Sequence, residues 1–426
     1  MLNFLKFVFL VQLLFFSSYL YAQNEPYSLE SLIRQALSSY PSVLSRQASK
    51  DAAVSDVDSA KLRFLPSPSI STQINQVTYS GAEPANLPGK TYTITQPLFL
   101  DGGLIAGYRK AKARLSAADY SILEAREDVA KRLVTYYSDW LRAWLKIQAL
   151  EENLRLHEKL VGTITRRFQQ GVAASADSDL AISRLEQAKS DLESQYSAEE
   201  NALSSISEMV GFKVIRSQLS AKISTSLDIP KRREGAEKAI ANSVTIERLK
   251  YEAESANEEA AETKALALPQ ASFQVQRQIG NPTIPGIKGY DLYGFVVSYA
   301  PGGGLSSLAS ANAAKERARA AFLQVDAAKR DLSDRLNSEY NEFEFSKLKR
   351  DSLKRSSALT SDISESYDRQ FLVGRKSWLE LMNAVRENAQ TLASLADAEA
   401  SILGASRRLS IYINGSLQFE DLASSK

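Results

Sequence analysis

The sequence contains no cysteine and only one histidine, His157. It therefore has no disulfides, no thiolate metal site and no lipid-bearing cysteine behind a leader. A single histidine also excludes most zinc and histidine-based catalytic sites. His157 falls on the apolar side of a predicted helix, so we interpret it as a packed or rim residue. The sequence predicts neither a metal site nor a cofactor.

An excess of charge of one sign is also missing. The 52 basic and 50 acidic residues leave a formal charge of +2, which indicates neither a nucleic-acid partner nor a polyanion. The segment Pro88-Gly89-Lys90-Thr91 resembles the end of a phosphate-binding loop, but Pro84 stands where the first glycine of such a loop is required. We find no nucleophile–base pair in the sequence and do not expect an enzyme.

Long apolar runs are missing outside the N-terminus. Residues 7–16 are almost all apolar, they follow Lys6, and the next segment ends in the small residue Ala22. This pattern predicts a secretory signal peptide over residues 1–22. The alternative is an uncleaved membrane anchor, which the short run disfavours because a span needs about 20 residues.

A very long helix is predicted where proline is absent for more than sixty residues. Apolar residues recur at alternating steps of three and four over residues 105–168, which is typical of a helix packed lengthwise on others. Such a helix would be roughly 95 Å long at about 1.5 Å per residue. No ordinary globular core is that deep, so the helix belongs to a long bundle, a coiled coil or a tube.

Two pairs of segments alternate between apolar and polar residues with a period of two. The first pair covers about 69–79 and 91–99, and the second covers about 271–279 and 290–299. Their length, their alternation and their aromatic ends are typical of a membrane β-barrel hairpin. For either pair in isolation, a soluble edge hairpin is the alternative.

The chain repeats one unit of helix, hairpin, long helix and helix, with the second long helix over 306–371. The offsets between matching residues are nearly constant: 203 positions from Pro66 to Pro269, 201 from Gly103 to Gly304, and 203 from Gly171 to Gly374. We predict a first repeat at 23–232, a second at 233–415 and a tail at 416–426. An internal repeat is a stronger signal than any single strand, and it supports the hairpin interpretation.

The shorter helices are predicted from capping residues and breakers. They cover residues 29–40, 42–64, 177–210, 234–267 and 377–413. Four strands per chain cannot close a barrel, since the smallest barrels have eight. An open sheet edge in lipid would leave N–H and C=O groups unpaired, so closure requires several chains.

The ordered set of motifs resembles the TolC-like outer-membrane efflux and type I secretion channels of Gram-negative bacteria, over nearly the whole mature chain. The resemblance depends on the duplicated architecture, on Gln96-Pro97-Leu98-Phe99 with the following glycines, and on two Phe-x-x-Gly segments. The strand-to-helix corners are Pro97, Gly102, Gly103, Pro301, Gly303 and Gly304.

The resemblance implies a mostly α fold with membrane β-structure. Three copies would form a twelve-stranded outer-membrane barrel continuous with a long α-helical tunnel through the periplasm. The homotrimer would dock to an inner-membrane transporter through a periplasmic adaptor (membrane fusion) protein. It would act as the exit duct of a tripartite efflux or type I secretion system.

The resemblance also implies a gate at the inner end of the tunnel. The candidates in this sequence are Phe168, Gly171, Asp177, Phe371, Gly374, Lys376, Glu380 and Asn383. The family often carries Tyr at Phe371, Arg at Lys376 and acids at both Glu380 and Asn383. A ring of Glu380 copies is expected to raise the pKa of each carboxyl group. The alternative is that Asp177 and Glu380 are ordinary acids near helix starts, where the helix dipole favours them.

Two other functions remain open from the sequence. A periplasmic coiled-coil adaptor or tether would also have a signal peptide and long helices, but it would have one helical hairpin flanked by soluble β-domains. A helical surface fibre would lack the duplicated hairpins.

Overall fold

The computed structural model describes residues 26–78, 85–98, 102–221, 229–281, 283–284, 288–300, 303 and 306–415. The predicted signal peptide and C-terminal tail lie outside these residues. The chain divides into two compact units. We call Leu44–Ala125 with Ser243–Leu332 the sheet unit, and Met1–Val43, Arg126–Asn242 and Ser333–Lys426 the helical unit.

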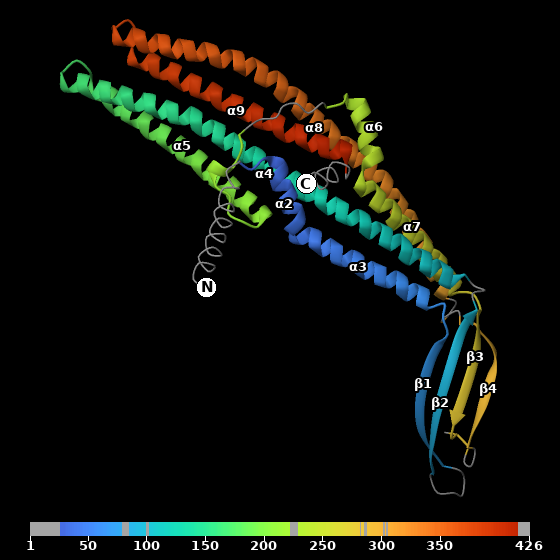
Figure 1. Ribbon diagram of the computed structural model, residues 1–426. Coiled ribbons are helices and arrows are strands. Elements are labelled where there is room, and N and C mark those ends of the chain that lie inside the picture. Colours follow the sequence, from blue (N-terminus) through green and yellow to red (C-terminus); the bar gives the residue numbers. More distant parts are fainter. Residues whose placement is uncertain are drawn as a thin grey trace, which may run out of the picture. The chain divides into compact units, whose positions relative to one another are not determined.

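The elements occur twice in the same order (Figure 1). The first series is α2 (Leu29–Ser39), α3 (Pro41–Leu62), β1 (Ser67–Val77), β2 (Ala85–Leu98), α4 (Gly103–Gln169) and α5 (Ser175–Val210). The second is α6 (Arg232–Asn242), α7 (Val244–Ala265), β3 (Gln270–Ile279), β4 (Gly289–Ser298), α8 (Ser306–Leu372) and α9 (Trp378–Asn414). A short 3-10 turn, Arg216–Gln218, follows α5. The long helices α4 and α8 both have 67 residues, so the repeat extends to the length of its elements.

One predicted helix is wrong, because residues 234–267 form two helices. The helix is interrupted at Ser243. The Ser243 side chain accepts a hydrogen bond from the Ile246 N–H at 3.3 Å and caps α7. The resulting α6 and α7 have 11 and 22 residues, the same lengths as α2 and α3. The break therefore makes the two halves more alike than the sequence indicated.

The predicted start of the second strand is also wrong. Strand β2 begins at Ala85, well before the predicted start at about residue 91. A proline removes one ladder donor and is tolerated where one side of the strand is unpaired. Pro88 lies opposite Ile74 of β1, beyond the residues paired with β3, and Pro97 lies opposite Ser272 of β3, beyond those paired with β1.

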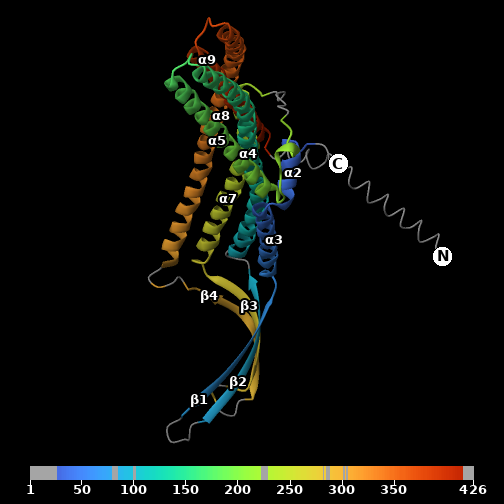
Figure 2. The same ribbon diagram turned by 90° about the vertical axis from the view of Figure 1, so that its left-hand side faces the viewer.

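The four strands form one antiparallel sheet in the order β1-β2-β3-β4. One row of directly opposite residues crosses all four strands: Ile70 of β1, Tyr92 of β2, Arg277 of β3 and Asp291 of β4. The sheet is visibly twisted and curved (Figure 2), as the right-handed twist of strands requires. Strands β1 and β4 each have one neighbour within the described part of the chain.

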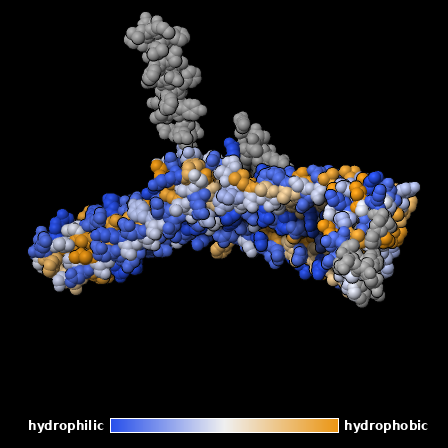
Figure 3. Space-filling view, turned by 90° about the horizontal axis from the view of Figure 1, so that it is seen from below, coloured by the Kyte–Doolittle hydropathy of each residue, from blue (hydrophilic) through white to orange (hydrophobic). Residues whose placement is uncertain are grey.

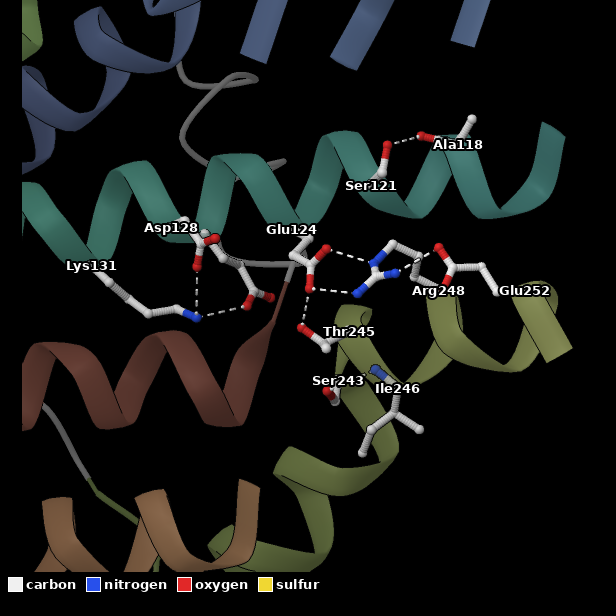
Figure 4. Close-up of polar contacts among 11 residues, drawn as sticks. Ala118, Ser121, Glu124, Asp128, Lys131, Ser243, Thr245, Ile246, Arg248 and Glu252 are labelled. Carbon is white, nitrogen blue, oxygen red and sulfur yellow. Dashed lines mark hydrogen bonds and ion pairs between the residues drawn. The ribbon is translucent and has the colours of Figure 1, made fainter. Parts of the chain in front are cut away.

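Helix α7 packs on the first part of α4 through a ladder of polar contacts in the sheet unit. Arg248 donates from Nε to Glu124 Oε2 at 2.6 Å, and Thr245 donates to Glu124 Oε1 at 2.8 Å (Figure 4). Further along, Tyr120 and Tyr251 stack with ring centroids 5.6 Å apart. These contacts fix the antiparallel register of the two helices.

The same ladder continues toward the strands with the charges exchanged between the helices. Arg114 of α4 pairs with Glu259 at 2.9 Å, and Lys110 pairs with Glu262. Thus α4 is basic where α7 is acidic near the sheet, and the signs reverse at Glu124. Sliding α7 along α4 would bring like charges together, so the charge pattern disfavours other registers of the two helices.

The helical unit has an apolar core along α4. Leu133, Trp140 and Ile147 are at most 1% exposed, and Leu32 of α2 is fully buried. Asn242 donates from Nδ2 to the Ile413 carbonyl at 2.8 Å and joins the end of α6 to α9. None of the helices that the structure describes is long and apolar enough to cross a membrane.

Candidate functional site

Two helix ends of the helical unit have the same backbone geometry. Gly171 follows α4 with φ +74°, and Gly374 follows α8 with φ +75°. At the first end, the Gly171 and Val172 N–H groups donate to the Phe168 and Arg167 carbonyls, both at 2.9 Å. This is a Schellman motif, and it requires a left-handed residue that glycine adopts without strain.

The second end repeats these bonds. Gly374 donates to the Phe371 carbonyl at 3.1 Å, and Arg375 donates to the Gln370 carbonyl at 2.9 Å. A Cβ added to either glycine would meet nothing within 4 Å, so backbone conformation and not crowding explains the residue. We call residues 168–177 the first tip and residues 371–380 the second tip.

The second tip is anchored by Phe371, which is 2% exposed. Its ring belongs to an apolar cluster with four buried residues: Leu160 of α4 and Leu381, Met382 and Val385 of α9. The Arg167 guanidinium lies over the ring, 4.8 Å from its centroid. Nearby, Lys159 of α4 pairs with Asp368 of α8 at 2.9 Å. The second tip is therefore joined to α4 by apolar, cation–π and ionic contacts.

A capping box begins α9 at the second tip. Ser377 Oγ accepts from the Glu380 N–H at 3.2 Å, and Glu380 Oε2 accepts from the Ser377 N–H at 3.0 Å. Lys376 donates to Glu380 Oε1 at 2.6 Å and lies 4.5 Å from the centroid of the Tyr367 ring. Both carboxylate oxygens of Glu380 are thus used within its own chain.

These contacts decide the charge of Glu380 in the single chain. The hydrogen bond from Lys376, followed by those from the Ser377 backbone and side chain, lowers the pKa of Glu380 to about 2. The same bond to Glu380 raises the pKa of Lys376. The pKa increase expected for a ring of Glu380 copies is thus opposed by local contacts, and the ring itself stays a prediction.

The first tip lacks this anchoring. Ala174 occupies the N-cap position of α5 and makes no side-chain hydrogen bond. Phe168 is 43% exposed and Val172 is 74% exposed. Asp177 lies in the first turn of α5, as the dipole interpretation expects. Asn383, a further gate candidate, is exposed and accepts a long 3.5 Å bond from Arg386.

The corner between β2 and α4 is built on glycine. Gly102 has φ +73°, and its carbonyl accepts from the Ala106 N–H at 3.0 Å as the helix starts. Gly103 is the first residue of α4. In the second repeat, Gly303 is described, whereas Pro301 and Gly304 lie outside the described residues.

The two faces of the sheet carry different side chains. In a soluble sheet the apolar side chains are buried and the polar ones exposed, whereas here the apolar side chains are the more exposed. On one face, Ile70, Tyr293 and Phe295 are 71%, 77% and 76% exposed. On the other face, Thr93 and Gln276 lie opposite each other and are half-buried. We call these the apolar face and the polar face. Hydrophobic residues are prominent around the strands, at the right of Figure 3.

His157 is packed in the helical unit. Its side chain is 5% exposed, and burial lowers its pKa, with a smaller contribution from Arg184. In the described part of the chain, His and acidic side chains do not gather into groups of three or more suited to a metal ion.

Sequence reasoning missed the contacts that hold the second tip. Lys159 and Asp368 are far apart in the sequence, as are Arg167 and Phe371, and nothing local to either residue indicates a partner. The duplication was the available signal. Matching Phe168 with Phe371 shows that one position has two different environments.

Comparison with known proteins gives a family match over part of the chain and a fold. The model of the family "Outer membrane efflux protein" matches residues 32–211, which run from α2 to the end of α5. Comparison with curated proteins gave no match.

Three solved channels illustrate the structural likeness. The outer-membrane channel OprN is 18% identical, with a TM-score of 0.80, over 91% of this chain and 90% of that one. CmeC of Campylobacter jejuni is 15% identical, with a TM-score of 0.78, over 93% and 89%. VceC of Vibrio cholerae is 14% identical, with a TM-score of 0.76, over 91% and 96%. The chain therefore has the fold of these outer-membrane channels, and the predicted resemblance is confirmed.

Proposed function

We propose that three copies of this chain form the outer-membrane exit duct of a tripartite efflux or type I secretion system. The observation that carries the proposal is the sheet. It presents large apolar side chains to the surroundings, and its two outer strands each have one neighbour among the described residues. Exposed apolar side chains are unfavourable in water, and open sheet edges are unfavourable in lipid. Both problems are resolved if copies close a barrel in lipid.

The duplicated helices support a duct over a tether. A periplasmic adaptor would have a single helical hairpin between soluble β-domains, whereas this chain has two long hairpins, α4–α5 and α8–α9. In the proposed assembly the helices form a tunnel through the periplasm, and a periplasmic adaptor joins it to an inner-membrane transporter.

We place the gate of the duct at the two tips. The contacts of Phe371 with Leu160 and Arg167 keep the second tip on α4 within each chain. Lys376 and Glu380 bond within the tip, and Gly171 and Gly374 set the turns. Lys376 pairs with the acid, so each copy adds little net negative charge. The closed end therefore depends more on packing than on an acidic ring.

The neighbouring valines of β4 provide a matched test of membrane insertion. Val297 lies opposite Ala271 on the apolar face, and Val296 lies opposite Ser272 on the polar face. Val297→Arg should cost about 2–4 kcal/mol if the site is near mid-bilayer, so trimer yield in the outer membrane should collapse. Val296→Arg should assemble like wild type, since its side chain faces water.

The mass of the complex in detergent completes this test. Light scattering should give about three chain masses for wild type and Val296→Arg. A stable monomer that still inserts in lipid, or equal assembly of both arginine variants, would refute the proposed function.

A further inference from the structure

We infer that the membrane segment of the duct is an uncharged passage that does not select solutes by the sign of their charge. The inference rests on the proposed function, because it takes the polar face of the sheet as the wall of the channel. It concerns the strands β1–β4 alone and is independent of the tips.

The register divides the strand residues between the two faces. Directly opposite residues of an antiparallel sheet lie on the same face, and successive residues alternate. Following the pairs from β1 to β4 places the polar side chains of the central strands together, for example Thr91, Thr93, Thr95, Gln274, Gln276 and Gln278. On β2 and β3 these side chains are half-buried or buried, whereas Ile94 and Val275 of the apolar face are exposed.

The distribution of charge within the strands is one-sided. The described strands contain three charged residues, Lys90, Arg277 and Asp291. The register places all three on the apolar face, where Arg277 and Asp291 pair across β3 and β4 at 3.4 Å. The polar face of the same strands has no charged side chain: it consists of hydroxyl and amide side chains together with apolar ones such as Leu292 and Val296 of β4.

A wall of this composition has a weak electrostatic field. Channels discriminate cations from anions mainly through rings of charged side chains, which concentrate counter-ions in the lumen. Hydroxyl and amide groups can turn a donor or an acceptor to either kind of ion. Symmetry-related copies repeat the same side chains around the barrel, so an uncharged face in one chain gives an uncharged wall in the assembly. The barrel would then pass hydrated solutes of either sign, limited by width.

The absence of native cysteine allows a direct measurement. The full-length mature protein carrying Gln276→Cys is reconstituted in phosphatidylcholine vesicles, whose surface is neutral. The thiol reacts in parallel with a cationic trimethylammonium and an anionic sulfonate methanethiosulfonate reagent. The ratio of the two rate constants, divided by the ratio for free 2-mercaptoethanol, reports the local potential. Thiol ionisation cancels because it enters both rates equally.

The expected ratio for Gln276→Cys is within about twofold of the free thiol, because the wall lacks fixed charge. A preference of tenfold or more for either reagent would overturn the inference. Thr95→Cys, on the same face, repeats the measurement and covers the case in which the first variant fails to assemble.

A charged neighbour calibrates the method. Thr93 lies directly opposite Gln276, so Thr93→Asp combined with Gln276→Cys places a carboxylate about 5 Å from the thiol. The ratio should then shift toward the cationic reagent by about three- to fivefold. No shift would mean that the ratio does not sense wall charge, and the proposed neutrality would lose its support.

Val275→Cys separates this inference from the proposed function. Val275 directly precedes Gln276 in β3 but lies on the apolar face, so lipid should shield it from both reagents. If Val275→Cys reacts as fast as Gln276→Cys, the strands are not in a membrane and the proposed function fails. If Val275→Cys is shielded and Gln276→Cys prefers one sign, the duct stands and only the neutral passage fails.

Discussion

The two tips of the helical unit share a backbone but not a means of attachment. Both turns depend on a glycine with φ near +75°, and both are closed by the same pair of backbone bonds. Phe371 is buried at the second tip, whereas its counterpart Phe168 is 43% exposed. Duplication has therefore preserved the geometry of the turn, while the side chains have diverged.

The formation of a turn and its attachment to a neighbouring helix therefore have different requirements. A Schellman motif satisfies its own carbonyls and needs no partner helix. Attachment to a neighbouring helix needs buried area and charge complementarity, and these occur at the second tip: the Phe371 cluster and the Lys159–Asp368 pair. We infer that the second tip is the more stable of the two.

The largest expected effect comes from removing the buried ring. Phe371→Ala should destabilise the closed second tip by about 3–5 kcal/mol, because a large buried side chain is replaced by a cavity. Phe168→Ala, at the matching exposed position, should cost less than about 1 kcal/mol. Amide hydrogen exchange of the α8–α9 and α4–α5 turns measures both, and equal losses of protection would contradict the difference between the tips.

A smaller effect is expected from the helix caps, and it can be tested in both directions. Ser377→Ala removes the capping box of α9 and should cost about 1 kcal/mol. Ala174→Ser introduces a cap at the matching position of α5 and should stabilise the first tip by up to about 1 kcal/mol. Hydrogen exchange at the first turn of each helix provides the measurement. A destabilised first tip in Ala174→Ser would show that α5 cannot use a cap.

The pH dependence of the second tip should follow Glu380. Its pKa of about 2 lies below the ordinary value of 4.5, so the ionised form stabilises the fold. That contribution is complete above about pH 4.5 and is lost as the pH falls toward about 2. Protection of the second tip should decline over this window in wild type, and Glu380→Gln should flatten the decline. An unchanged profile in the variant would assign the effect to other groups.

The sequence predicted the repeat and most helix ends because prolines and glycines mark them locally. It missed the break at Ser243, since a serine cap differs little from any other serine in a polar helix. It also left Pro88 and Gly89 outside the second strand, because whether a strand is paired on one side or both depends on tertiary structure. The burial of Phe371 depends on Leu160 of α4, a contact that local sequence does not encode.

The bonding of Glu380 was harder to predict than its place near the start of a helix. The resemblance pointed to Glu380, and the structure shows a capping residue paired with Lys376. The spacing Ser377-x-x-Glu380 was visible in the sequence as a capping box signature. The sequence interpretation weighed Glu380 only as a ring acid or as an acid favoured by the helix dipole, and so it missed this local signal.

The most direct test of the account is single-channel conductance of the reconstituted protein, compared between Phe371→Ala and Phe168→Ala. If the chain is a membrane duct whose inner end is held closed by the second tip, wild type and both variants should form a pore. Phe371→Ala should show a higher conductance or longer openings, and Phe168→Ala should behave like wild type. If both variants behave like wild type, the second tip is not the gate; if none of the three forms a pore, the chain is not a duct.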